Sequence, residues 1–341
     1  MSNYTVKRTS LTDIARLANV SKPVVYTVLK NRENTNIGVS QETRERILKI
    51  ASELGYVAAK SAKELFTGRS DNIGVIIHVL APYAVEILSF LEKEAHKRHL
   101  EITPYITECN PLLEEQYLEQ ARDGRVDGII AVSTIAGSID RYRKYMAHPY
   151  NLVILHRASA PTPGVSTVYF DGRTAGELAA QHLVEIGRRR LAFFGGTAQS
   201  SRARGFVAGC EKAGLPEPLI FTGEAYATDF QQGRALARDF LHIRPLPDGV
   251  FCSNDQLGVA LLTQSNDAGL SIPDDMAIVG CDNSEICLYT TPALSSIDTG
   301  NSLLASKSLE VLLRLLQDRP DAPVYDNVPV SLVARGSTSG K

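Results

Sequence analysis

Short apolar runs alternate with helix-length segments along most of the chain, and this alternation restricts the possible folds more than any other sequence feature. Such runs are typical of buried strands, and strands that alternate with helices form parallel sheets in α/β domains. The predicted strands are Ile73–Leu80, Gly128–Val132, Leu152–Leu155, Leu191–Phe194, Gly249–Cys252 and Ala277–Val279, and the first predicted helix is Val85–His99. Because about a dozen strands would overfill one sheet, we expect two parallel-sheet subdomains.

The segment before these strands has a different pattern. Residues 10–29 predict two short helices joined by a tight turn. Ser10 is a suitable N-cap for the first helix, and Asn19 tolerates the left-handed backbone that ends it. Ser21 is a suitable N-cap for the second helix, where Pro23 fits the first turn. The sequence therefore predicts a helix-turn-helix near the N-terminus.

One side of the second helix is predicted to stay free for a partner, because Val25, Val28 and Leu29 share the side that packs on the first helix. The residues of the free side are Lys22, Pro23, Tyr26 and Thr27. A helix-turn-helix presents such residues to the DNA major groove. The alternative is a helical hairpin that serves only as scaffold. A third helix predicted after Ser40, with an apolar stripe, favours a compact all-α headpiece and hence the DNA interpretation.

The distribution of charge supports this interpretation. The net charge of the chain is only −2, but residues 1–70 hold 12 Lys and Arg against 6 Asp and Glu, and the remainder holds 24 against 32. A basic head on an acidic body is the asymmetry expected when the head alone contacts phosphates.

Three segments resemble the start of a lactose-repressor (LacI/GalR) family transcription factor. They are LTDIARLANVS, VSQETRERILKIASELGY and SAKELFTGRSDNIGVI. The resemblance extends to the C-terminus, which reads LVARGST, and so covers essentially the whole chain. It implies a regulator that binds double-stranded operator DNA as a homodimer and is controlled by a small-molecule effector, with a sugar or sugar derivative as first expectation.

The resemblance also implies a domain organisation. Residues 1–57 would form the headpiece and residues 58–71 a hinge helix and linker. Residues 72–338 would form a periplasmic-binding-protein-like body. Within this body, the first subdomain would comprise about 72–168 and 298–326, and the second about 169–297 and 327–338, with three crossings of the chain between them.

Several DNA contacts follow from the same resemblance. Ser21, Ser40 and Thr43 would contact phosphate oxygens, since short hydroxyls at helix N-termini suit that geometry. Leu65 matches the leucine that the family wedges into the minor groove; its alternative is packing against the body. Lys22 is suited to donate to guanine, and the methyl group of Thr27 to contact thymine. Family members often carry Thr-Val-Ser-Arg where this chain has Val24 to Thr27, so an unusual half-site is expected.

Ligands of doubly wound sheets bind beyond the carboxyl ends of the strands, and polar residues follow several predicted strands. By resemblance, Arg202, Asn254 and Asp282 bind the effector, and their donors and acceptors suit vicinal hydroxyl groups. Each has a simpler alternative as a helix cap or surface pair, above all Asn254. In the first subdomain, Tyr83 would supply a stacking ring. The remaining candidates there are Ser133, His156 and Phe170; His156 has the alternative of a satisfied strand-end histidine.

Other classes of protein are disfavoured. The sequence has no Walker-type loop, no G-x-G-x-x-G after a strand, no H-E-x-x-H and no G-x-S-x-G, so an enzyme is not expected. Neither a cofactor nor a metal is expected, and the five scattered cysteines are interpreted as buried free thiols. A solute-binding protein would have a similar body, but the basic headpiece and the lack of an export signal oppose it. We expect no membrane span and a cytoplasmic location.

Overall fold

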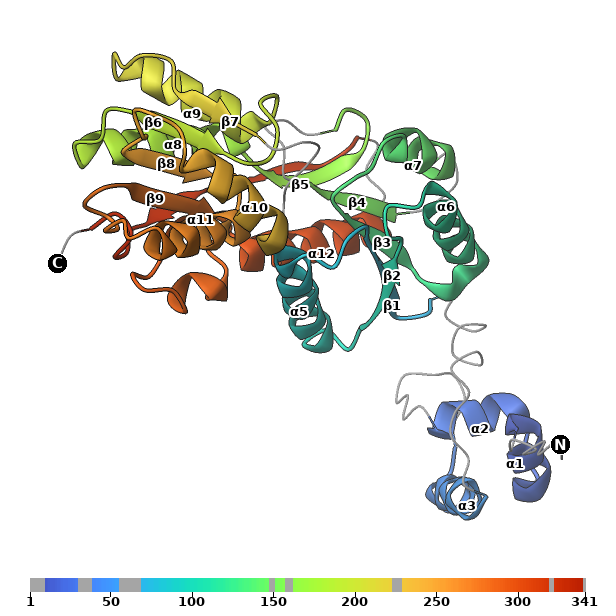
Figure 1. Cartoon of the computed structure of the whole chain (residues 1–341). Helices are drawn as coiled ribbons and strands as arrows, with labels where there is room; N and C mark the ends of the chain where they lie inside the picture. Colours follow the sequence, from blue (N-terminus) through green and yellow to red (C-terminus); the bar gives the residue numbers. More distant parts are fainter. Residues whose placement is uncertain are drawn as a thin grey trace, which may run out of the picture. The chain divides into compact units, whose positions relative to one another are not determined.

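The computed structural model describes residues 10–29, 39–54, 69–146, 151–156, 162–222, 229–318 and 322–339 (Figure 1). The chain divides into two compact units, Met1–Ser70 and Asp71–Lys341. The first unit is helical, and the second contains two six-stranded sheets with helices between the strands. This confirms the predicted fold class.

The helical unit contains α1 (Leu11–Ala18), α2 (Lys22–Leu29) and α3 (Gln41–Glu53). The predicted cap at Ser10 is present and forms a capping box, because the Ser10 side chain accepts a hydrogen bond from the Asp13 backbone while the Asp13 side chain accepts one from the Ser10 backbone. Asn19 ends α1 in the left-handed conformation, with φ of 53°. Ser40 caps α3 as its position predicts. Local sequence therefore determines where these helices begin and end.

The free side predicted for α2 is smaller in the structure. Lys22 and Pro23 are exposed, but Tyr26 is only 8% exposed and Thr27 only 5%. The prediction that these last two residues lie on an open face is therefore wrong. The eight-residue helix packs against both α1 and α3, so its later residues are enclosed and only its first turn stays open.

The first sheet has the strand order β11-β5-β4-β3-β1-β2, and its strands are parallel. Their bounds are β1 (Asn72–Ile77), β2 (Glu101–Ile106), β3 (Gly128–Val132), β4 (Asn151–His156), β5 (Ser166–Phe170) and β11 (Tyr325–Val328). The apolar runs did not identify β2, which lies at the edge of the sheet and contains Pro104. Proline lacks the backbone N–H that an interior strand needs, so an edge is where it fits.

The second sheet has the order β12-β10-β9-β8-β6-β7. Its strands are β6 (Leu191–Phe194), β7 (Leu219–Phe221), β8 (Gly249–Cys252), β9 (Ala277–Cys281), β10 (Ser295–Asp298) and β12 (Ser331–Val333). Only β12 runs antiparallel to its neighbour. The helices of this unit are α5 (Pro82–His96), α6 (Pro111–Gln120), α7 (Ser138–Met146), α8 (Gly172–Glu185), α9 (Ser201–Lys212), α10 (Phe230–Phe240), α11 (Asp255–Asp267) and α12 (Asn301–Asp318), with short turns η1 (Ala121–Arg125) and η2 (Glu285–Leu288).

The chain passes between the two sheets three times. The passages lie between β5 and α8, between β10 and α12, and between β11 and β12. Consequently α12 packs on the first sheet although it follows a strand of the second. Three connections tie the two sheets into one unit.

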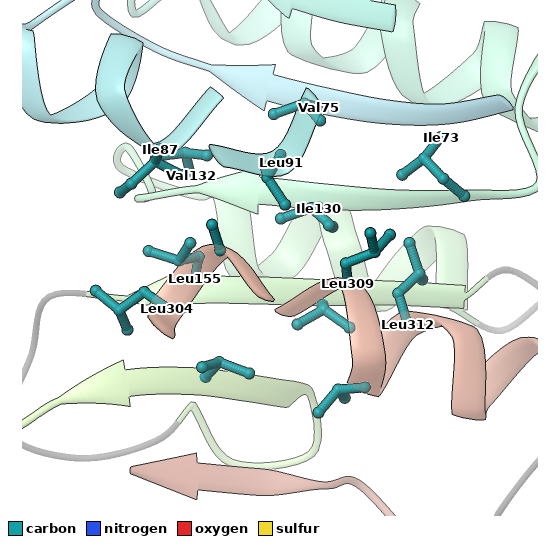
Figure 2. Packing of buried hydrophobic residues seen from close by; sticks show 14 of the residues in the cluster. Ile73, Val75, Ile87, Leu91, Ile130, Val132, Leu155, Leu304, Leu309 and Leu312 are labelled. Carbon is teal, nitrogen blue, oxygen red and sulfur yellow. The ribbon is translucent and has the colours of Figure 1, made fainter. Parts of the chain in front are cut away.

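The first sheet is covered on both faces, as its apolar strands require. Alternate residues point to opposite faces of a strand, so Ile73 and Val75 pack toward α5 and α12 while Ile76 packs toward α6 and α7. Figure 2 shows Ile87 and Leu91 of α5 and three leucines of α12 over Val75, Ile130 and neighbouring strand residues. The second sheet is built in the same way, with α10 and α11 on one face and α8 and α9 on the other.

Helices α8 and α9 approach each other closely at glycines. A Cβ atom added to Gly205 would lie 2.0 Å from the Arg173 carbonyl oxygen, and one added to Gly176 would lie 2.1 Å from the Arg202 carbonyl oxygen. Real side-chain atoms do not approach backbone this closely. The two glycines therefore fix the position of α9 against α8.

We expect the substitution Gly205→Ala to destabilise the second unit by about 3 kcal/mol, since the new methyl group would force the two helices apart. Urea unfolding followed by circular dichroism measures this change. Arg204→Ala, on the exposed side of the same helix, is the control and should change stability by no more than about 0.5 kcal/mol. Equal stability of the two variants would show that α8 and α9 can separate without cost.

Candidate functional site

A cavity of about 420 Å³ lies beyond the carboxyl ends of strands from both sheets. Its lining residues follow β1, β3, β6, β8 and β9, which is where ligands of parallel sheets bind. Five of the seven predicted effector residues line it: Tyr83, Ser133, Arg202, Asn254 and Asp282. The structure therefore brings together side chains that lie up to about two hundred positions apart in the sequence.

Arg202 belongs to the first turn of α9. The helix starts at this point because the Ser200 side chain accepts a hydrogen bond of 3.2 Å from the Ala203 backbone. The Arg202 guanidinium donates to the Ser253 carbonyl oxygen at the end of β8. A guanidinium carries five N–H donors in a planar fork, so this contact orients the group and leaves other donors for the cavity.

Asn254 caps α11, and its side-chain oxygen accepts a hydrogen bond of 2.9 Å from the Leu257 backbone. The simpler alternative for this residue, a helix cap, is thereby confirmed. The same residue lines the cavity. Capping therefore does not exclude contact with a ligand.

Two residues of the cavity wall have unusual backbone conformations. Asp282 has φ of 120° and Ser133 has φ of 70°. Such conformations cost about 1–3 kcal/mol in residues other than glycine and persist where the surrounding structure enforces them. At Asp282 the backbone N–H donates to the Ile297 carbonyl at 2.9 Å, which ties this residue to the neighbouring strand β10. The Ser133 N–H likewise donates to the Leu155 carbonyl at 2.9 Å, so the backbone of each residue is tied to a neighbouring strand.

Sequence reasoning did not identify the role of Asp255. Its carboxylate is buried and accepts hydrogen bonds from the Ser284 backbone at 2.7 Å, from the Ser284 hydroxyl at 2.8 Å and from the Ser296 hydroxyl at 2.6 Å. It therefore joins the start of α11 to the loop after β9 and to β10. The sequence signal that could have identified this role is its position directly after Asn254, at the end of a strand.

Further short polar residues of the wall were also missed. They are Thr197, Ser200, Ser253, Gln256 and Ser284. Each lies within a few residues of a strand end in the second sheet. Ser, Thr and Gln are common at strand ends and helix starts for local reasons, so their type alone does not distinguish a binding residue from a cap.

The two remaining effector predictions have different outcomes. The prediction for Phe170 is wrong, because this side chain is fully buried in the core between the first sheet and α12. Its place next to a chain crossing suggested the cavity, but its apolar ring packs inward as β5 alternates. His156 is the last residue of β4, and its side chain lies outside the part that the structure describes.

The predicted DNA-contacting residues belong to the helical unit. Ser21, Lys22 and Pro23 are exposed around the start of α2. At the start of α3, the Ser40 hydroxyl lies 2.9 Å from the Thr43 hydroxyl and accepts a hydrogen bond of 3.3 Å from the Thr43 backbone. Leu65 lies outside the described residues. The open surface at α2 thus consists of a lysine, a serine and a proline, with Tyr26 and Thr27 behind them.

The cysteines are free, as predicted, but they are not all buried. Cys210, Cys252, Cys281 and Cys287 are buried, and Cys109 is exposed. Burial, with the Asp255 carboxylate nearby, raises the pKa of the Cys252 and Cys287 thiols well above the usual range. These thiols therefore stay protonated and unreactive. Within the described residues, no group of three or more His, Cys, Asp or Glu side chains is arranged to hold a metal ion.

No helix among the described residues is both long enough and apolar enough to cross a membrane.

Comparison with known proteins gives two family matches and several relatives. Residues 10–58 match the model of bacterial regulatory proteins of the lacI family, and residues 180–338 match a periplasmic binding protein-like domain. The HTH-type transcriptional repressor PurR of Haemophilus influenzae (strain PittEE) is 25% identical over 319 residues, which cover 92% of each chain.

Solved structures resemble the chain over most of its length. A lac repressor dimer bound to operator and the anti-inducer ONPF has a TM-score of 0.84 at 22% identity, covering 97% of this chain and 99% of that one. A LacI family transcriptional regulator from Enterococcus faecium with bound ribose has a TM-score of 0.68 at 25% identity, covering 79% of this chain and 98% of that one.

We expect Asp255→Ala to lower the free energy of unfolding by about 2–4 kcal/mol, because three donors would lose a buried acceptor. Chemical denaturation of the full chain measures the loss. Asp274→Ala changes an exposed aspartate in the same half of the body and should be nearly neutral. A stable Asp255→Ala protein would mean that water replaces the carboxylate without cost.

Proposed function

Because the chain belongs to the lacI family of bacterial regulatory proteins, and is therefore a DNA-binding transcriptional regulator and not an enzyme, we propose that it is a repressor. In this proposal it binds a pseudo-palindromic operator as a homodimer, and a small molecule bound in the cavity controls its affinity for DNA. The observation that carries the proposal is the convergence of Arg202, Asn254 and Asp282 at one cavity, in a chain that also has a basic helix-turn-helix.

The proposed effector is a sugar or sugar derivative. Asp282 offers acceptors, Arg202 offers donors and Asn254 offers both, which suits a molecule with several hydroxyl groups. Tyr83, Pro82 and Val79 give the opposite wall an apolar character, which suits the apolar face of a sugar ring. The regulator from Enterococcus faecium that was solved with ribose supports this class of ligand.

The proposed homodimer is supported by exposed apolar side chains on the body. Leu288 is 59% exposed and Tyr289 70% exposed, on and beside η2. Large exposed apolar side chains that lie near one another mark interaction surfaces. Two copies would present two headpieces to the two halves of a palindrome.

The proposed mechanism is a shift between two states of the body. The cavity is lined by both halves of the body, so a ligand can favour one relative arrangement of the halves. It acts only through its different affinity for the two arrangements. The segment of residues 58–71, which the resemblance assigns as hinge, would pass the change to the headpieces. Because such a regulator acts on chromosomal DNA, we also propose a cytoplasmic location.

The effector and the operator are identified first. A thermal-shift screen of sugars, sugar phosphates and nucleobases should raise the unfolding midpoint for the ligand of the cavity, since a molecule that binds only the native state stabilises it. Genomic binding selection should yield a half-site unlike the common family consensus, because Val24 to Thr27 differ from the usual residues. Failure to bind any duplex at low ionic strength would contradict the proposed function.

We expect Lys22→Ala to weaken binding to the selected operator by about 1–3 kcal/mol and to relax one base position, since Lys22 is the exposed donor at the start of α2. Fluorescence anisotropy on operator and random duplexes measures this. Lys49→Ala, which removes the same charge from an exposed position of α3, is the control. Equal weakening of Lys22→Ala on both duplexes would point to phosphate contact and against base reading.

We expect Asp282→Ala to abolish the response to the effector and to leave operator affinity unchanged, because the carboxylate lines the cavity and the headpiece is a separate unit. The measurements are the ligand-dependent midpoint shift and operator binding with and without the ligand. Asp274→Ala is again the control. A wild-type response in the Asp282→Ala protein would exclude this residue from the binding site.

A further inference from the structure

A buried carboxylate lies next to the first-subdomain wall of the cavity. Glu114 is in the first turn of α6 and its side chain is fully buried. Leaving a charge in the protein interior is unfavourable unless it is paired and hydrogen-bonded. Such a pair is weak evidence for stability, because apolar residues of similar volume often serve equally well. Stability alone therefore does not explain the buried carboxylate, and the positions of its partners indicate what else it does.

Both carboxylate oxygens of Glu114 have partners. Oε1 accepts from the Ser138 hydroxyl at 2.7 Å and from the Tyr142 hydroxyl at 2.5 Å. Oε2 accepts from Arg141 Nε at 2.5 Å, and Arg141 Nη2 also pairs with it. Burial and the adjacent carboxylate hold the pKa of Tyr142 well above its usual range, so this hydroxyl keeps its proton and donates. All three partners belong to α7.

The partners on α7 hold the loop that follows β3. The Ser138 hydroxyl, which donates to Glu114, also accepts from the Ile135 backbone at 3.0 Å. Arg141 donates to the Ala136 carbonyl at 3.1 Å. This loop begins at Ser133, the residue with φ of 70° that lines the cavity. Glu114 thus fixes Ser138 and Arg141, and these two residues fix the loop that begins at Ser133.

The same carboxylate faces the loop that follows β1. His78 Nε2 lies 3.4 Å from Glu114 Oε1 without a hydrogen bond, and His78 Nδ1 lies 2.7 Å from the Thr107 hydroxyl. Burial lowers the pKa of His78, with the Arg141 charge acting in the same direction and Glu114 opposing it. The imidazole is therefore neutral near pH 7 and sits between α6 and the end of β2. The next residue, Val79, lines the cavity, and Tyr83 lies in the same segment.

We propose that Glu114 is a positioning residue for the effector cavity. None of its hydrogen-bond partners lines the cavity, but these partners belong to α7 and hold the wall segment 133–138, so Glu114 fixes this segment against α6. The role of this segment in binding rests on the proposed function. The positioning role itself concerns only the order of the loop 133–138, so it is testable without a ligand.

A matched control is present one residue further along. Glu115 also joins α6 to α7, through Lys144 at 2.8 Å, but this pair lies at the surface. Glu115→Gln therefore breaks a link between the same two helices without touching this wall segment. Glu114→Gln keeps an oxygen that can accept from Ser138 and Tyr142 and loses the pairing with Arg141. Glu114→Ala loses all of these contacts.

The test is hydrogen–deuterium exchange of backbone amides in the full-length chain under native conditions. Glu114→Ala should speed exchange in residues 133–138, whose amides at Ser133, Ile135 and Ser138 donate hydrogen bonds, by about tenfold or more, as expected for local opening. Glu114→Gln should partly restore slow exchange. Glu115→Gln should match the wild type. Residues 196–202 and 282–284, the wall from the second subdomain, should be unchanged in all variants.

Two results would overturn the proposal. One is equal acceleration throughout the first sheet, including the interior of β1 and β3, which is the result of a general loss of stability. The other is unchanged exchange of residues 133–138 in Glu114→Ala. If the Glu114 variants do not fold, Ser138→Ala provides the test, since it removes one link and should speed exchange in 133–138 more than in the interior of β1 and β3. Equal acceleration in the loop and in these strands would then reject the proposed role. Loss of DNA binding by the wild type would bear on the proposed function alone.

Discussion

The strands of each sheet run parallel, apart from β12, and the chain passes between the sheets at only three places. Parallel order sends every βα loop of one sheet to the same edge, where the carboxyl ends of the strands lie. The crossings after β5 and β10 leave from this edge and join the two halves beside it. The cavity results from this arrangement, because loops after β1 and β3 of one sheet meet loops after β6, β8 and β9 of the other. Without the strand order, no pair of its lining segments would be near neighbours.

The wall of the cavity contains features that the protein interior usually avoids. Ser133 and Asp282 have left-handed or related backbone conformations, and Asp255 is a buried carboxylate. The apolar clusters on both faces of the two sheets offset this cost. Rigid strands and well-packed helices can hold strained loops in place, and binding residues are often placed on such loops. The division of roles is therefore clear: strands and helices supply stability, and the loops after the strands supply chemistry.

The sequence was most informative where the local pattern decides the structure. The strand bounds Gly128–Val132, Leu191–Phe194 and Gly249–Cys252 were predicted correctly, because each is a continuous apolar run followed by a turn. The caps at Ser10 and Ser40 were also predicted, since a cap depends on a few neighbouring residues. Strands at the sheet edges, such as β2 with its proline, have too few apolar residues to be recognised in this way.

Burial that depends on distant parts of the chain was not predictable from local pattern. Tyr26 and Thr27 follow the helical spacing of an open face, but α3 also packs on α2 and encloses them. Phe170 adjoins a crossing, yet the alternation of β5 turns its ring inward. The prediction of Arg202, Asn254 and Asp282 relied on family resemblance together with their position after strands; geometry then placed them at one cavity. Asp255 was missed because its three partners come from residues about thirty to forty positions away, which no sequence spacing indicates.

In each half of the body, a buried carboxylate ties together elements on its own side of the cavity. Asp255 ties the start of α11 to the loop after β9 and to β10, and Glu114 ties α6 to α7. Neither carboxylate spans the two halves, so each wall is held internally and independently of the other. A ligand between two firm walls spends little binding free energy on ordering loops. More of the binding free energy then depends on how the two walls face each other. A ligand shifts a conformational equilibrium through the difference in its affinity for the two arrangements. Firm walls within each half and few links between the halves are thus the combination that makes a cavity of this kind suitable for regulation.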